Sequence, residues 1–96
     1  MAEQEIKIEI EDKIAGGIYS NLAIISHSEN EFIMDFVFVH PPKGKVNSRV
    51  ITSPSHAKRL LGALLQNIEK YEQKFGVIKE APEPPKFGGS VGFSKN

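Results

Sequence analysis

Residues 37–60 are the part of this chain whose side chains could bind a ligand, because basic residues gather there. This segment carries five bases and no acid, whereas residues 1–36 carry eight acids and two bases. It also contains the start of an expected helix, where free N–H groups attract anions. The sequence therefore predicts a candidate site for a phosphate group or a nucleic-acid backbone. The candidate residues are Lys43, Lys45, Arg49, Ser55, His56, Lys58 and Arg59.

The same basic residues allow a second interpretation, in which they neutralise the acidic strands of this chain or of a partner subunit. Bases near the start of a helix are electrostatically unfavourable, since the helix dipole already places positive charge there. Their position therefore requires an explanation, but it does not by itself establish a ligand.

Asp35 is the one acidic residue in a strongly apolar run, residues 32–39. Antiparallel pairing of this run with residues 46–52 brings Arg49 opposite or diagonal to Asp35, within cross-strand reach. A carboxylate on an apolar face needs a partner. We therefore expect an Asp35–Arg49 pair that fixes the strand register or lies in a dimer interface; a catalytic acid is the alternative.

Sequence motifs of enzymes are absent. There is no dinucleotide-binding glycine motif, no Walker loop, no serine-hydrolase elbow and no His-Glu-x-x-His. The chain contains no cysteine, which excludes disulfides, iron–sulfur clusters and thiol catalysis. The spacing of His27, His40 and His56 is not that of metal ligands. We expect a protein that is not an enzyme and that needs no metal or cofactor.

Four segments of the chain have the patterns of β-strands. Residues 5–11 alternate strictly between isoleucine and charged residues, which predicts a half-buried strand at a sheet edge. Further strands are expected at residues 18–26, 32–39 and 46–52, separated by a polar run and by a turn that contains proline and glycine.

A long helix is expected near residues 54–75. Ser53 is a favoured N-cap, Pro54 suits the first helical position, and Gly76 predicts a left-handed C-cap. The predicted fold is thus α+β: a four-stranded antiparallel meander followed by one C-terminal helix packed on one face. Residues 1–78 form the single domain.

Residues 79–96 are rich in proline and glycine, and we expect a flexible, disordered tail there. Phe87 and Phe93 in this tail are either a short partner-binding motif or part of an ordinary disordered end.

Residues 32–39 are apolar on both faces of their predicted strand, whereas one helix covers only one face of a sheet. The second face would leave Ile33, Val37, Val39 and Ile51 in water, and monomers rarely expose such a patch. We expect self-association, with a two-fold dimer as the default; otherwise the first strand or the tail folds over this face. The candidate interface residues are Ile33, Asp35, Val37, Val39, Arg49 and Ile51.

The sequence favours a cytoplasmic protein without a membrane segment. The acidic N-terminal segment lacks the pattern of a signal peptide, and no apolar run approaches the ~20 residues that span a bilayer. The lack of cysteine also favours a reducing compartment.

Several runs of the sequence resemble an uncharacterised bacterial and archaeal family, a domain of unknown function of about a hundred residues. The resemblance spans roughly residues 18–78. The family has no assigned activity, so the resemblance implies no catalytic residue. The runs are Tyr19-Ser20-Asn21, Glu31-Phe32-Ile33-Met34-Asp35-Phe36, residues 48–60, Lys70-Tyr71-Glu72 and Phe75-Gly76.

The expected architecture is also similar to the core of the SecB-type export chaperone, a likeness of fold that carries little weight for function. Three functions are therefore considered: a non-enzymatic, self-associating interaction module; binding of nucleic acid or another anion through the basic segment; and SecB-like binding of unfolded polypeptide.

Overall fold

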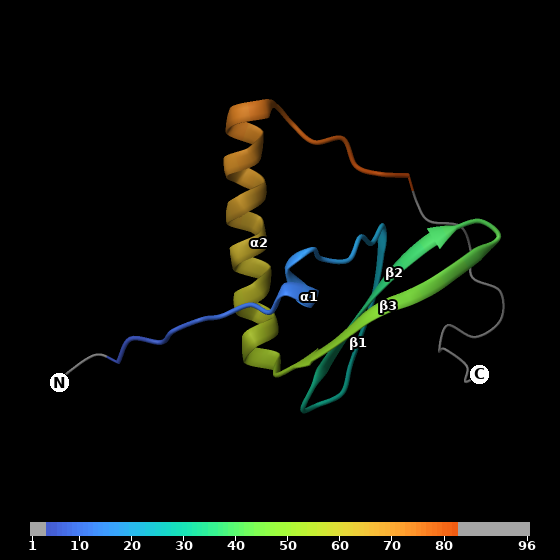
Figure 1. The fold of residues 1–96 in the computed structure, drawn as a ribbon. Coiled ribbons are helices and arrows are strands. Elements are labelled where there is room, and N and C mark those ends of the chain that lie inside the picture. The colour runs from blue at the N-terminus through green and yellow to red at the C-terminus, as the bar shows by residue number, and fades with distance from the viewer. Residues whose placement is uncertain (1–3, 83–96) are drawn as a thin grey trace. The chain divides into compact units, whose positions relative to one another are not determined.

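The computed structural model describes residues 4–82 and has an α+β architecture (Figure 1). Three strands form an antiparallel sheet in the order β1-β2-β3, so β2 is central and β1 and β3 are the edges. The predicted α+β class is confirmed, with three strands in place of the four expected. The elements are α1 (Asp12–Ala15), β1 (Leu22–His27), β2 (Phe32–His40), β3 (Lys43–Thr52) and α2 (Pro54–Phe75).

The described residues belong to two compact units. Residues 4–26 and 33–51 hold α1 and almost all of the sheet, and residues 27–32 and 52–82 hold α2 and the loop between β1 and β2.

The predicted strand at residues 5–11 is not formed, and residues 4–11 have no regular secondary structure. Ile6 and Ile8 are 82% and 88% exposed. An alternating pattern suits a sheet, but a strand also needs a neighbour for its backbone N–H and C=O groups. The short helix α1, which the sequence pattern did not predict, follows directly.

The strand β1 begins at Leu22, four residues later than predicted, because Asn21 pairs with β2 through its side chain. The Asn21 amide donates to the Val39 carbonyl at 3.0 Å and accepts from the Val39 N–H at 2.8 Å. The Asn21 backbone N–H also donates to the Val37 carbonyl at 3.1 Å. This side chain therefore continues the ladder where the backbone of β1 has not yet begun.

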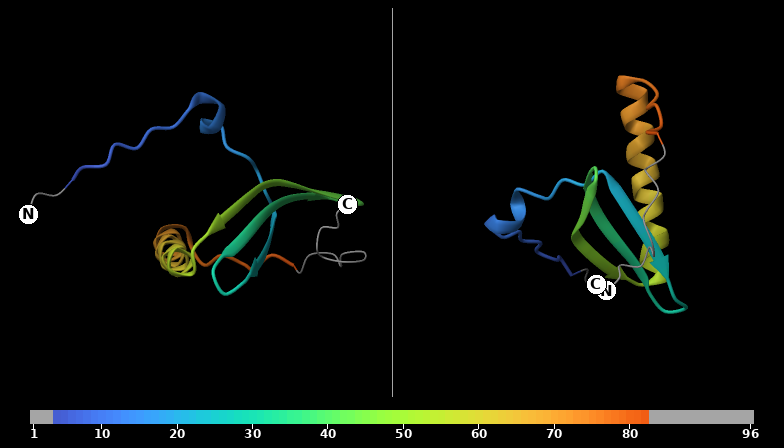
Figure 2. Two further views of the ribbon diagram at one scale, coloured as in Figure 1. Left: turned by 90° about the horizontal axis from the view of Figure 1, so that it is seen from below. Right: turned by 90° about the vertical axis from the view of Figure 1, so that its right-hand side faces the viewer.

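The strands β2 and β3 form a long, curved hairpin, which Figure 2 shows from two sides. Pro41 and Pro42, joined by a cis peptide bond, make its two-residue turn. Consequently β3 begins at Lys43, three residues before the predicted start, and the basic residues 43 and 45 belong to the strand. A side chain at Gly44 would contact Val39 and Val37, at 3.5 and 3.7 Å, so this part of β3 lies closely against β2.

The buried residues of the described chain all lie on the central strand. They are Met34 (8% exposed), Asp35 (2%) and Val37 (5%). Met34 and Val37 occupy opposite faces of β2, since side chains alternate along a strand. The expectation that Val37 lies in water is wrong, since Val37 is 5% exposed on a strand that has a neighbour along each edge. Ile33 and Val39 are partly buried, and Ile51 is exposed.

The helix α2 has the predicted bounds. Ser53 caps its start by accepting a hydrogen bond from the His56 N–H at 3.1 Å. Gly76 ends it with φ +100°, although ψ 168° is extended and not the predicted left-handed helical value. No residue of α2 is buried, and its packing on the sheet stays a prediction.

The predicted tail is described only as far as residue 82, and residues 79–82 have no helix or strand. Phe87 and Phe93 lie outside the described residues. Within residues 4–82, no helix is both long and apolar enough to cross a membrane.

Candidate functional site

The predicted Asp35–Arg49 pair is present and joins β2 to β3. Arg49 Nε donates to Asp35 Oδ1 at 2.7 Å, and Nη2 donates to Oδ2 at 2.9 Å. These hydrogen bonds, helped by the attraction of the guanidinium charge, hold the pKa of Asp35 below its usual value although burial opposes the shift. The same contact raises the pKa of Arg49. A carboxylate held in its charged form is poorly suited to donate protons at neutral pH, which favours a structural role.

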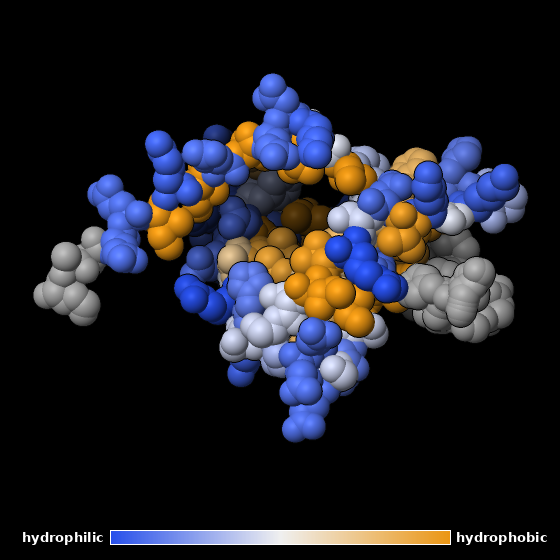
Figure 3. All heavy atoms as spheres, turned by 60° about the horizontal axis from the view of Figure 1, so that its bottom comes forward, coloured by the Kyte–Doolittle hydropathy of each residue, from blue (hydrophilic) through white to orange (hydrophobic). Residues whose placement is uncertain are grey.

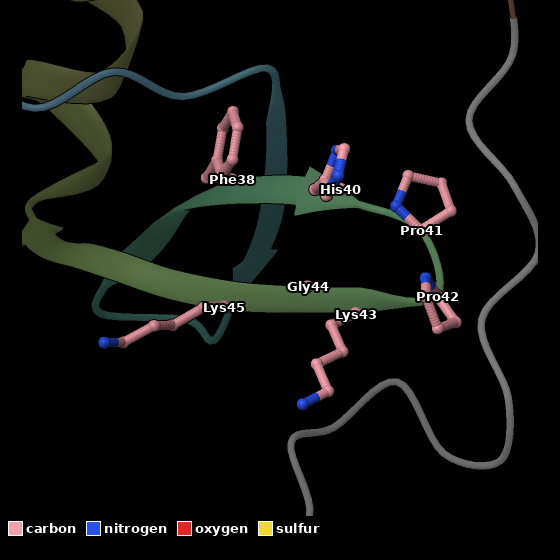
Figure 4. Close-up of a pocket in the computed structure, with 7 residues that line it drawn as sticks. All are labelled: Phe38, His40, Pro41, Pro42, Lys43, Gly44 and Lys45. Carbon is pink, nitrogen blue, oxygen red and sulfur yellow. The ribbon is translucent and has the colours of Figure 1, made fainter.

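The tip of the β2–β3 hairpin carries an open pocket of about 330 Å³ (Figure 4). Figure 4 shows Lys43 and Lys45 extending to the same side of β3, whereas Phe38 and His40 come from β2. Two amines beside an apolar wall can attract an anion that also has an apolar part. The lining residues are Phe38, His40, Pro41, Pro42, Lys43, Gly44 and Lys45.

The remaining anion candidates lie in the first turns of α2. The Ser53 hydroxyl accepts a hydrogen bond from the His56 N–H, so this N–H already has a partner. The Ser53 hydroxyl also lies 3.3 Å from the Ser55 hydroxyl. Lys58 and Arg59 are exposed one turn further along. The predicted anion site thus consists of two clusters, one on β3 and one on α2, and Arg49 already binds Asp35.

An apolar stripe on α2 is open to solvent. Its side chains recur at steps of four and three residues, the spacing of one helix face. Tyr71 and Phe75 are in contact, with ring centroids 4.9 Å apart. In Figure 3 hydrophobic side chains, coloured orange, are visible on the surface of the molecule. The large exposed residues of the stripe are Leu61, Leu64, Ile68, Tyr71 and Phe75.

The predicted interface on the sheet is less open than expected. Asp35 and Val37 are already buried within the chain. Only Arg49 and Ile51 of this candidate set are exposed. Association through this face therefore stays a prediction, and the larger open apolar surfaces are α2 and residues 5–11.

Two contacts in the structure were not predicted from the sequence. One is the Asn21–Val39 pairing, beside which the Tyr19 ring meets Phe38 edge-on at 6.1 Å. The other is the Glu72 carboxylate, which accepts from the Ile78 N–H at 2.9 Å and holds the chain beyond α2. The only sequence signal for the first was the Tyr19-Ser20-Asn21 run of the family resemblance.

Residues 4–82 contain no group of three or more histidine or acidic side chains that could hold a metal ion. The titratable pair with shifted pKa values is Asp35–Arg49.

Comparison with known proteins agrees with the resemblance. A family model described as "Protein of unknown function (DUF3467)" matches residues 1–80. The match includes residues 5–11, which the resemblance from the sequence runs had left outside. No curated protein and no solved structure matches the chain.

Proposed function

Since the chain belongs to the DUF3467 family of proteins of unknown function, we propose from its structure that it is a non-enzymatic module that associates with a second copy of itself. The observation that carries this proposal is the exposed apolar stripe of α2, which in this proposal faces a second helix in place of the sheet face predicted for it. Twenty large hydrophobic residues of the described chain are exposed, whereas Met34 and Val37 are its buried hydrophobic residues. Such apolar surface is typical of a protein that binds a partner.

The stripe of α2 is complementary to itself when two helices run antiparallel. Together with Ala57, four residues before Leu61, the stripe has six members. They follow one another at alternating steps of four and three residues, the repeat of helices that pair side by side. Antiparallel pairing matches the smallest member with an aromatic one, which fills space evenly. The facing pairs are Ala57 with Phe75 of the partner subunit, Leu61 with the partner's Tyr71 and Leu64 with the partner's Ile68.

Charges beside the stripe favour the antiparallel direction. Lys58 and Glu72 flank it on the same side, fourteen residues apart. Antiparallel pairing brings Lys58 near the partner's Glu72, whereas parallel pairing places these two flanking positions on opposite sides of the interface and forms no such ion pair. An exposed ion pair contributes only about 0.2–1 kcal/mol, so these charges select the direction and the apolar stripe supplies the strength.

Light scattering coupled to size-exclusion chromatography tests the proposal. We expect a dimer at tens of micromolar and a monomer for Leu64→Glu, which places a charge within the stripe. Gln66→Glu, on the outer side of the same helix, is the matched control and should remain dimeric. A wild-type protein that stays monomeric would refute self-association.

The direction of pairing has its own test. Lys58→Glu and Glu72→Lys should each weaken the dimer, and the double variant should restore it. Weakening that persists in the double variant would contradict the antiparallel arrangement.

We place this homodimer in the cytoplasm of a bacterial or archaeal cell. The support is the lack of cysteine, because exported domains of this size are commonly stabilised by disulfides.

Anion binding at the hairpin tip is a second candidate function, favoured by the pocket that Lys43 and Lys45 line. A fluorescent oligonucleotide should bind at low salt and dissociate as salt increases, since phosphate contacts release counterions. Lys43→Glu with Lys45→Glu should abolish binding, and Lys58→Glu with Arg59→Glu tests the helix cluster separately. No binding at low salt would remove this candidate.

The exposed apolar residues would also suit a binder of unfolded polypeptide. If the protein proves monomeric and slows the aggregation of a denatured client, this SecB-like function replaces self-association as the better explanation.

A further inference from the structure

Residues 5–11 have the composition of a strand but no strand to pair with. Isoleucine occupies every even position from 6 to 10, and charged residues occupy every odd position from 5 to 11. The isoleucines are exposed and no regular secondary structure forms. Flexible linkers are typically polar, and three isoleucines on one side of a segment are not typical of them. The pattern is therefore that of a strand whose partner is missing.

The strand β3 offers an edge that matches this segment. It is an edge strand of the sheet, so one row of its backbone N–H and C=O groups has no neighbouring strand within the sheet. Gly44 lies against Val37 and Val39, so its neighbours Lys43 and Lys45 take the other side of the sheet.

Placed side by side, residues 5–11 and β3 are complementary: their apolar side chains can share one side of the sheet, and their opposite charges can share the other. The isoleucines of residues 5–11 would extend the side of the sheet on which Gly44 lies against Val37 and Val39. Glu5 and Glu9 would lie on the side of Lys43 and Lys45, and opposite charges on neighbouring strands attract. The segment 5–11 carries a net charge of −2, from three glutamates and one lysine.

We propose that residues 5–11 of one copy add to the β3 edge of a second copy as a fourth strand. This inference rests on the proposed self-association and names a contact within it. The addition places three exposed isoleucines and an open sheet edge in one interface.

A second copy fits this edge better than the chain's own segment does. Asn21 is held on the side of β2 that faces β1, by its hydrogen bonds to Val37 and Val39. The chain therefore enters the sheet on the side away from β3. Its own residues 5–11 would have to cross a face of the sheet to reach β3, whereas a partner's segment approaches from outside.

The lack of cysteine permits a direct cross-linking test on the full chain. Lys45→Cys is mixed in turn with Glu5→Cys, Lys7→Cys and Glu9→Cys, each made as a separate protein, and the mixtures are oxidised. We expect one of these mixtures to give a disulfide-linked species of doubled mass. Ile8→Cys mixed with Lys45→Cys is the matched control, because its side chain points to the other side of the strand and should give little product.

The same test distinguishes exchange between copies from folding back. If no mixture exceeds the control, or if Lys7→Cys with Lys45→Cys in one chain links only within the monomer, the inference is overturned.

A second measurement separates this inference from the proposed function. Ile8→Pro removes a backbone donor from the added strand and should weaken the dimer, whereas Ile8→Val should not. Backbone amides of residues 6–10 should exchange slowly in the wild-type dimer and quickly in the proline variant. A wild-type dimer that Ile8→Pro leaves unchanged, with unprotected amides at 6–10, would refute strand addition and leave self-association intact.

Discussion

Asp35 and Arg49 show how a single ion pair can fix a two-stranded ribbon. The Asp35 side chain is 3% exposed, whereas half of the Arg49 side chain reaches solvent. Two hydrogen bonds at 2.7 and 2.9 Å satisfy the carboxylate from one guanidinium. A shift of the strands by one residue would leave the buried charge without its partner, at considerable cost. The pair therefore specifies the alignment of β2 with β3.

The pair predicts a pH dependence of stability. Because the pKa of Asp35 is lowered in the folded chain, its contribution is complete above the unfolded value of about 4. The contribution is lost as the pH falls through the lower folded value. We expect Asp35→Asn to lower the urea midpoint at pH 7, with the difference from wild type shrinking below pH ~4. An equal difference at pH 7 and pH 2.5 would contradict this account.

Asn21 gives a second prediction for a single residue. Asn21→Ala removes both hydrogen bonds to Val39 and should lower the free energy of unfolding by about 1–2 kcal/mol. Amide exchange at Val39 should accelerate. Asn47→Ala, at an exposed asparagine of β3, is the control, and an equal effect of both variants would argue against a specific role for Asn21.

These two sites show what the sequence could predict about single residues. The Asp35–Arg49 contact was predicted, because a charge in an apolar strand needs a partner and strand pairing limits where that partner lies. Asn21 was missed, because a side chain that imitates backbone pairing leaves no periodic pattern. The two basic clusters of the predicted anion site, on β3 and on α2, belong to separate units. The composition of the segment does not reveal this division.

Among the elements, α2 was predicted to the residue and the first strand was wrong. The bounds of a helix depend on local signals, here Ser53 with Pro54 at the start and Gly76 at the end. A strand depends on a neighbour that can lie far away in sequence or in another molecule. The alternation of residues 5–11 predicted a strand that the chain does not form by itself, because the pattern does not specify a neighbouring strand.

Two glycines of the helix region should respond in opposite directions to alanine. Gly62 lies in the interior of α2 and has open space around it, so Gly62→Ala should stabilise the helix by about 0.5–1 kcal/mol. Gly76 also has open space, but its φ of +100° disfavours a side chain, so Gly76→Ala should destabilise by about 1–2 kcal/mol. Thermal unfolding followed by circular dichroism measures both, and a shift in the same direction would contradict this interpretation.

For the whole molecule, association makes stability depend on concentration. If folded chains are held as dimers, each tenfold increase in protein concentration favours the folded dimer by about 1.4 kcal/mol. The thermal midpoint should then rise by several degrees over a hundredfold range of concentration. Leu64→Glu should remove the dependence and Gln66→Glu should retain it. A midpoint independent of concentration in the wild type would indicate a monomer.

The charged odd positions of residues 5–11 have one more consequence. Unpaired strands rich in isoleucine can stack on copies of themselves without limit and grow into fibres. Stacking in register would place each glutamate about 4.8 Å from its copy in the next chain, and like charges at that spacing repel. Glu5, Glu9 and Glu11 therefore act as gatekeepers that disfavour identical strands and favour a basic edge. An acidic strand of this kind can be left open to solvent while the chain still avoids amyloid.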